Sequence, residues 1–120
     1  MSLKKILVVD DDSDLLDVVE DYLEEYNVCR GSSGRDGIEK MTSQSIDLVI
    51  TDVHMPDGNG YAFLEFLKVE FPNVPVILMS GVDDIDVAQE SLDRGAITFI
   101  FKPFDRSELG QAVEKALSKI

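Results

Sequence analysis

The 120-residue sequence has one cysteine and no apolar run longer than a few residues. Because Cys29 has no second cysteine to pair with, an intramolecular disulfide is excluded, which fits a reducing, cytoplasmic location. Its place in a short apolar segment favours a buried side chain over a reactive thiol. The short apolar runs predict no transmembrane helix, and the start at Lys4 and Lys5 lacks the apolar region of a signal peptide.

Positive charge is also scarce, with 11 basic against 24 acidic residues and a formal net charge of -13. Nucleic acid binding depends largely on Lys and Arg neutralising phosphates, and attachment to anionic lipid needs basic residues too. We therefore expect no direct nucleic acid binding and no membrane attachment. The length suits one domain, and a hydrophobic content of 44% is enough for a packed core.

The chain alternates short apolar runs with segments of helical periodicity, without repeats or low-complexity stretches. Strands are predicted at 6–9, 28–30, 47–51, 76–79 and 97–101. Helices are predicted with apolar positions from Leu15 to Tyr26, then at 35–43, 61–70 and 84–94, and from Asp105 to Ile120. Five strand–helix units predict an α/β fold, a doubly wound parallel sheet with helices on both faces.

Local capping signals mark several helix ends. Ser13 or Asp12 is a candidate N-cap for the first helix. Gly95 is placed to end the fourth helix. Asp105 with Glu108 three residues later has the spacing of a capping box at the start of the last helix.

Charged residues gather where three predicted strands end. Asp10, Asp11 and Asp12 follow the first strand, Asp52 follows the third, and Lys102 follows the fifth. The carboxyl ends of strands are where open α/β sheets bind ligands. Two carboxylates about 4 Å apart repel by roughly 4 kcal/mol at an effective dielectric near 20. A cation is therefore needed, and Mg²⁺ suits one or two carboxylates. The pattern indicates a phosphoryl-transfer site.

Each of these residues has a simpler interpretation when it is taken alone. Three acids favour a helix start through the macrodipole, and we assign that role to Asp12. Ser80 at the end of the fourth strand could cap a turn, and Lys102 could be a surface lysine. The presence of Asp52 at the same edge favours a phosphoryl-transfer site over these simpler interpretations. Pro103 is a candidate for a cis peptide bond, because such bonds are cheap only before proline.

Together these segments resemble the receiver domain of two-component response regulators. The matching pieces, in order, are 7–12, 52–56 with Gly60, Ser80, 95–96 and 99–104. The resemblance covers residues 1–120 as a single receiver domain. It implies a flavodoxin-like (βα)5 fold with five parallel strands in the order 2-1-3-4-5.

The resemblance also implies roles for the matching residues. Asp52 would accept a phosphoryl group from the phosphohistidine of a sensor histidine kinase or phosphotransfer protein. Mg²⁺ would be held by Asp11, Asp52 and the backbone carbonyl of His54, with Asp10 acting through metal-bound water. Ser80 and Lys102 would contact the phosphoryl group, and Phe99 would be the switch aromatic.

The implied output is a switch of the surface formed by the fourth helix, fifth strand and fifth helix. That surface would act on a downstream effector protein or domain, and it could also form a homodimer. Such a domain assists its own phosphorylation and dephosphorylation but is not a separate turnover enzyme. Whether it stands alone or belongs to a longer regulator or hybrid kinase stays open.

Some positions depart from the commonest family pattern. Gly58 stands where the family often has an apolar residue, and Gly81 stands where it often has alanine. Each glycine predicts a looser loop. Ser80 replaces a more frequent threonine and keeps the hydroxyl, whereas Phe99 has none. The side chain of His54 could be a metal ligand or relay phosphodonor, but an exposed side chain that tunes solvent or phosphatase access is favoured.

Three alternatives share parts of the pattern. A haloacid-dehalogenase-like phosphatase needs a second acid two residues after its nucleophile, where this chain has His54. A flavodoxin-like FMN protein is opposed by the three acids after the first strand, which would repel phosphate. The third alternative is a phosphorylation-independent interaction module. The complete set of Asp11, Asp52, Ser80 and Lys102 argues against it.

Overall fold

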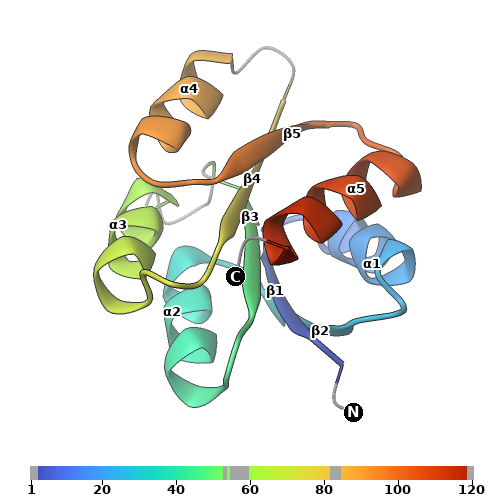
Figure 1. Cartoon of the computed structure of the whole chain (residues 1–120), viewed down its shortest axis with the longest axis horizontal. Helices are drawn as coiled ribbons and strands as arrows, with labels where there is room; N and C mark the ends of the chain where they lie inside the picture. The colour runs from blue at the N-terminus through green and yellow to red at the C-terminus, as the bar shows by residue number, and fades with distance from the viewer. Residues whose placement is uncertain (1–2, 53, 55–59, 82–84, 119–120) are drawn as a thin grey trace.

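The computed structural model describes residues 3–52, 54, 60–81 and 85–118. Its strands and helices alternate along the chain (Figure 1). The strands are β1 (Lys5–Val9), β2 (Asn27–Gly31), β3 (Leu48–Asp52), β4 (Val76–Gly81) and β5 (Thr98–Lys102). The helices are α1 (Ser13–Tyr22), α2 (Gly34–Ser43), α3 (Gly60–Glu70), α4 (Ile85–Asp93) and α5 (Arg106–Leu117). All strand pairs are parallel and the order is β2-β1-β3-β4-β5, which confirms the predicted fold class and topology.

The sheet is covered on both faces (Figure 1), with α1 and α5 on one side and α2, α3 and α4 on the other. Alternate residues of β1 pack into different layers. Ile6 and Val8 belong to the core under α1 and α5, whereas Leu7 and Val9 belong to the core on the other face. All four are fully buried. This two-sided burial explains why the strand is a continuous apolar run.

The first helix is shorter than its apolar spacing predicted. It begins after Asp12, the N-cap, and ends at Tyr22. The chain must then turn so that the amide of Asn27 can donate to the carbonyl of Lys4 at 2.9 Å and start β2. Tyr26 therefore lies in this turn, although its side chain still packs against the core.

The other predicted caps are confirmed. Gly95 has φ +117°, and the amides of Gly95 and Ala96 donate to the carbonyls of Leu92 and Ser91. This pair of bonds is a Schellman ending, in which glycine adopts the positive φ without a steric cost. Asp105 and Glu108 form the reciprocal capping box of α5. The predicted positions Asp84 and Ile120 lie outside the described residues.

Four strands continue one or two residues beyond their predicted ends. β2 includes Gly31, β3 includes Asp52, β4 includes Ser80 and Gly81, and β5 includes Lys102. The predicted ends stopped at the last apolar residue or one residue after it, but the parallel ladder continues further. Asp52 pairs with Met79, and Gly81 pairs with Lys102. The polar residues are therefore held by the sheet itself.

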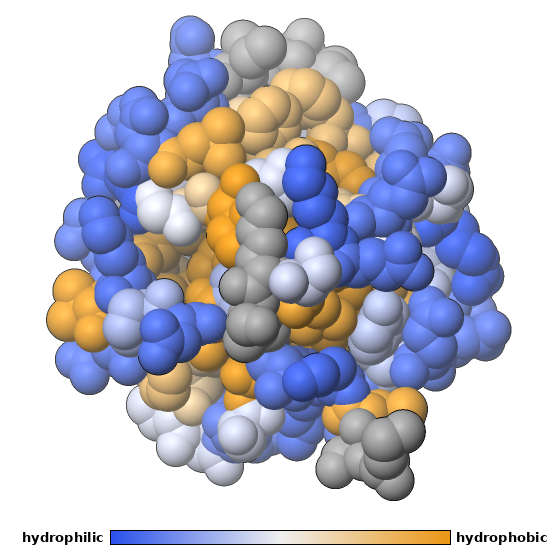
Figure 2. Space-filling view, in the orientation of Figure 1, coloured by the Kyte–Doolittle hydropathy of each residue, from blue (hydrophilic) through white to orange (hydrophobic). Residues whose placement is uncertain are grey.

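Hydrophilic residues cover the flanks of the molecule and hydrophobic ones gather towards its middle (Figure 2). No described helix is long and apolar enough to cross a membrane. Cys29 is half-buried in β2, where its Sγ accepts a 3.5 Å hydrogen bond from the side-chain amide of Gln44. It is less enclosed than the sequence predicted.

Candidate functional site

Three strand ends bring Asp10, Asp52 and Lys102 into contact. The Nζ of Lys102 donates to Oδ2 of Asp52 at 2.6 Å and to Oδ2 of Asp10 at 2.8 Å. These partners lie 50 and 92 positions away from Lys102 in the sequence. The β1-β3-β4-β5 order carries these strand ends to one edge of the sheet, as the sequence predicted.

Both carboxylates are buried and fully engaged. Asp10 is 1% exposed and Asp52 is 6% exposed. The second oxygen of Asp10 accepts from the backbone amide of Asp12 at 2.9 Å, and that of Asp52 accepts from the amide of His54 at 2.8 Å. A buried carboxylate is costly unless it is paired and hydrogen-bonded, and each oxygen here has such a partner.

The charges of this cluster do not balance. Burial raises the pKa of Asp10, while the hydrogen bond and charge of Lys102 act in the opposite direction. Burial alone would lower the pKa of Lys102, but its hydrogen bonds to Asp10 and Asp52 outweigh that effect and raise it. Two carboxylates share one ammonium, so the site favours a further cation.

The residues at this edge fit a hard divalent cation. Asp10 and Asp52 supply carboxylate oxygens, and Asp11 is exposed directly after Asp10. Within the part of the chain that the structure describes, no three Asp, Glu, His or Cys side chains form a ready-made metal cage. Mg²⁺ usually binds through one or two carboxylates and keeps several waters, so this donor set suits it.

The three consecutive acids have different structural positions. Asp10 faces Lys102 in the buried cluster. The side chain of Asp12 accepts from the amides of Asp14 at 3.0 Å and Leu15 at 3.3 Å, so its predicted helix-start role is confirmed. Asp11 lies between them and is exposed. Its role as a metal ligand stays a prediction.

Ser80, His54 and Pro103 lie at or just after the strand ends of this edge, whereas Phe99 is near the start of β5. Ser80 is 1% exposed, and its hydroxyl donates to the carbonyl of Gly81 at 3.3 Å. The half-buried ring of Phe99 packs edge-on against Phe101, with 5.0 Å between centroids. His54 is exposed and reaches Asp52 through its backbone amide. The Lys102–Pro103 peptide bond is cis. The roles of Ser80, Phe99 and the His54 carbonyl stay predictions.

Sequence reasoning placed Asp10, Asp52 and Lys102 at one sheet edge but did not predict the direct bond from Lys102 to Asp10, because no local signal links positions so far apart. It also missed two glycines beneath the site. The carbonyl of Gly31 accepts from the amide of Asp10 at 3.0 Å, and Gly37 of α2 packs closely against the residue before Asp10. A glycine on the inward face of a predicted helix was the available signal for Gly37.

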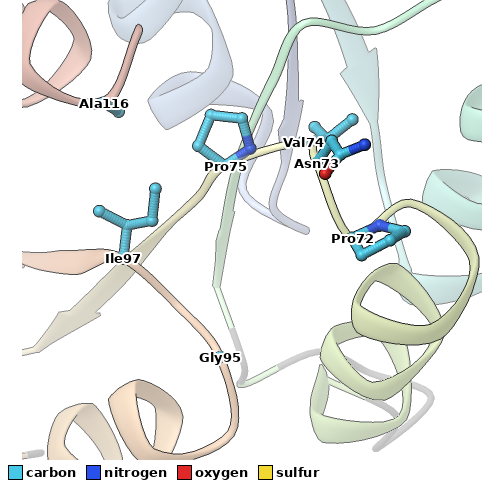
Figure 3. Close-up of a pocket in the computed structure, with 7 residues that line it drawn as sticks. All are labelled: Pro72, Asn73, Val74, Pro75, Gly95, Ile97 and Ala116. Carbon is cyan, nitrogen blue, oxygen red and sulfur yellow. The ribbon is translucent and has the colours of Figure 1, made fainter. Parts of the chain in front are cut away.

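A separate cavity lies at the opposite end of the sheet (Figure 3). It encloses about 500 Å³ where β4 and β5 begin, and Pro72, Pro75 and Ile97 are among its lining residues. None of the described residues that line it is charged. It therefore offers no group for the chemistry of the carboxylate cluster.

Comparison with known proteins agrees with this geometry. A model described as the response regulator receiver domain matches residues 6–114. The Escherichia coli K12 transcriptional regulatory protein ZraR is 37% identical over 115 residues, covering 94% of this chain but only 26% of that protein. The Bacillus subtilis sporulation initiation phosphotransferase F is 34% identical, covering 98% of this chain and 96% of that protein. A Clostridium thermocellum receiver-domain crystal structure superposes with a TM-score of 0.90 at 35% identity, covering 98% of this chain and 96% of the other. The chain belongs to the response regulator receiver domain family.

Proposed function

We propose that Asp52 is the phosphoacceptor of this receiver domain, in a Mg²⁺-dependent reaction. The observation that supports this most is the ammonium of Lys102 bridging Asp10 and Asp52. It holds the acceptor carboxylate beside a fixed cation, in a site with excess negative charge. Such a site offers the positioning and charge stabilisation on which phosphoryl transfer mainly depends.

The donor in this proposal is a phosphohistidine of a sensor histidine kinase or phosphotransfer protein. A lone pair of an Asp52 carboxylate oxygen forms a bond to phosphorus, and the phosphorus–nitrogen bond breaks. The electron pair of that bond stays on the imidazole nitrogen, which takes a proton from water. Asp52 is 6% exposed, so the donor phosphoryl group must enter the strand edge to reach it.

Several residues stabilise the transferred group in this proposal. Lys102 already lies within hydrogen-bond distance of the acceptor and can donate to a phosphoryl oxygen as a point cation. Asp11, Asp52 and the carbonyl of His54 would hold Mg²⁺, with Asp10 acting through a bound water. The metal offsets negative charge on the phosphoryl group. The chain then carries a covalent modification and does not turn over a substrate.

Phosphorylation is proposed to act as a switch through Ser80 and Phe99. The hydroxyl of Ser80 now bonds to its own strand at Gly81, and a phosphoryl group on Asp52 offers it a more highly charged acceptor. Moving Ser80 would repack Phe99 and alter the surface of α4, β5 and α5. A shift from 1:99 to 99:1 needs about 5.5 kcal/mol of differential stabilisation, of which these contacts supply a part.

The partner that reads this surface is proposed to be an effector protein or domain. Relatives named as transcriptional regulators extend well beyond the matched region, since this chain spans 26% of ZraR and 25% of the Proteus hauseri regulator NtrC. The relative named a sporulation initiation phosphotransferase is matched over 96% of its length. Homodimerisation through α4, β5 and α5 is a further part of this proposal.

The deciding experiment is intact mass measurement after incubation with acetyl phosphate. Wild type should gain one phosphoryl group only when Mg²⁺ is present, and Asp52→Asn should gain none. Asp12→Asn is the matched control, because asparagine also caps helices well and the fold should be kept. An adduct that persists in Asp52→Asn would refute the assignment.

Two other results would favour the alternatives. Failure of wild type to form an adduct, with no trapping by beryllofluoride, would support an interaction module that works without phosphorylation. Sustained hydrolysis of a phosphomonoester would support a phosphatase with an aspartate nucleophile.

A further inference from the structure

A close three-way contact lies directly beneath the carboxylate cluster. It joins Gly37 of α2, Val9 of β1 and Phe63 of α3, all of them buried. A Cβ placed on Gly37 would lie 2.8 Å from Cζ and 3.0 Å from Cε1 of Phe63, and 3.2 Å from Cγ2 of Val9. The absence of a side chain at position 37 is therefore what lets α2 approach both elements.

One side of this contact leads straight to Asp10. Val9 is the residue before it, and Val9 pairs with Gly31 on one side and Thr51 on the other. A Cβ on Gly31 would also lie 3.2 Å from Val9 and 3.5 Å from the Cα of Gly37. The carbonyl of Gly31 accepts from the amide of Asp10. The backbone of Asp10 is therefore supported by three residues, Val9, Gly31 and Gly37.

The other side of the contact leads to Asp52. Phe63 lies in the first turn of α3 and is fully buried. It belongs to the same buried cluster as Val49 of β3, and that strand ends at Asp52. A displacement of Phe63 therefore acts on the core that packs against the strand carrying Asp52.

We propose that Gly37 is a positioning residue for the carboxylate site, setting the placement of α3 relative to Asp10 through its contact with Phe63. This inference rests on the proposed function. Gly37 touches neither the phosphoryl donor nor the cluster. It acts by keeping the support of Asp10 and the core beneath β3 at one fixed separation.

The expected response to a methyl group at position 37 follows from which neighbour can move. Val9 is held in two strand ladders and is fully enclosed. Phe63 belongs to a helix packed on the sheet from one face. A tightly packed core transmits such a displacement rather than absorbing it. The Gly37→Ala variant should therefore shift the start of α3 and disturb the site.

The test compares Gly37→Ala, Phe63→Leu and the double variant, with Gly110→Ala as the control. Leucine lacks the Cζ and Cε1 atoms that the new methyl group would meet. Gly110 is also inside a helix, but a Cβ there meets nothing within 4 Å. The rate of adduct formation is measured against acetyl phosphate and Mg²⁺ concentrations, together with the thermal midpoint of each variant.

Gly37→Ala should lower the phosphorylation rate about tenfold at saturating acetyl phosphate, because small misplacements of reacting groups are costly. The double variant should phosphorylate at nearly the rate of Phe63→Leu alone, and Gly110→Ala should phosphorylate much as wild type does. Two results would overturn the proposal. One is a Gly37→Ala rate equal to that of wild type, and the other is a loss that Phe63→Leu does not reverse.

A second readout separates this proposal from the proposed function. The carboxyl carbon shifts of Asp10 and Asp52 can be followed by NMR without any phosphoryl chemistry. They should move in Gly37→Ala, return in the double variant and stay fixed in Gly110→Ala. Wild type could accept no phosphoryl group while the chemical shifts still follow this pattern. In that case the positioning role of Gly37 is supported and the proposed function is refuted. Unchanged shifts in Gly37→Ala would reject positioning in either case.

Discussion

The Nζ of Lys102 lies 2.6 Å from Oδ2 of Asp52, and the same ammonium lies 2.8 Å from Oδ2 of Asp10. The lysine side chain is 27% exposed, whereas the two carboxylates are almost fully enclosed. One partly exposed cation therefore holds two buried anions. The cluster is organised before any ligand arrives and retains an excess of negative charge.

Because negative charge is in excess in this cluster, substitutions of Asp52 and Lys102 should have opposite effects on stability when no divalent cation is present. Asp52→Asn should raise the free energy of unfolding by about 1 kcal/mol, because it removes one of two like charges in a buried site. Lys102→Met should lower it by about 2 kcal/mol, because two buried carboxylates then lack their cation. Urea denaturation measures both. The Asp52→Asn/Lys102→Met double variant should be more stable than Lys102→Met alone, and a less stable double variant would contradict this account.

Adding and removing Mg²⁺ should change the thermal stability of wild type. A ligand that binds only the folded state adds about 1.4 kcal/mol at ten times its dissociation constant. We expect the thermal midpoint to rise with Mg²⁺ and to return after chelation. Asp11→Asn should abolish most of this response, whereas the helix-capping Asp12→Asn should keep it. An unchanged response in Asp11→Asn would show that the exposed Asp11 is not a ligand.

The end of α4 is attached to α3 by Arg94. Its guanidinium lies 4.5 Å from the centroid of the Tyr61 ring, and it also contacts Glu90 at 2.9 Å and Glu65 at 3.8 Å. We expect Arg94→Gln to lower the free energy of unfolding by about 1 kcal/mol, since exposed cation–π and ion-pair contacts are each worth less than that. Urea denaturation again measures the change.

A double-mutant cycle with Tyr61→Leu isolates the ring contact. We expect a coupling energy of about 0.5 kcal/mol between Arg94 and Tyr61. Arg94→Lys should keep the charge but lose most of the stacking, because lysine has no planar group. Full stability in Arg94→Lys, or no coupling in the cycle, would assign the contact no energetic role.

Stability above neutral pH should depend on Tyr26. Burial raises the pKa of this side chain above 10.0, and the charges of Glu25 and Glu114 add to the effect. The folded state then keeps the phenol proton at pH values where the unfolded state has lost it. The free energy of unfolding should therefore fall as pH rises from 10.0 through the higher pKa of the folded state.

Tyr26→Phe should remove that part of the pH dependence. Urea denaturation below and above pH 10.0 tests this, and the absorbance of tyrosinate in wild type and variant follows the titration directly. An equal loss of stability with pH in both proteins would show that Tyr26 is not its source.

Local sequence signals were enough to predict the order and type of every helix and strand. Apolar runs identified the strands because both faces of a parallel sheet are buried. The capping box of Asp105 and Glu108 and the glycine ending at Gly95 were predictable because their bonds join residues a few positions apart. Strand order followed from the family resemblance, and the structure agrees with it.

Boundaries were harder to predict where long-range bonds set them. The apolar spacing of α1 continues to Tyr26, but the helix ends at Tyr22 because the next strand must begin beside β1. Asp52 and Lys102 are polar, yet both remain in strands because the ladders of neighbouring strands continue past the apolar core.

The sequence by itself therefore determined the fold class and the set of polar residues at one sheet edge, since both depend on short-range patterns. Only the tertiary structure decided how those residues divide their roles. It buried Asp10 against Lys102, left Asp11 exposed and gave Asp12 to the helix cap. It also placed Gly37 against Phe63. Such contacts depend on how separate elements pack together, and no local pattern along the chain encodes them.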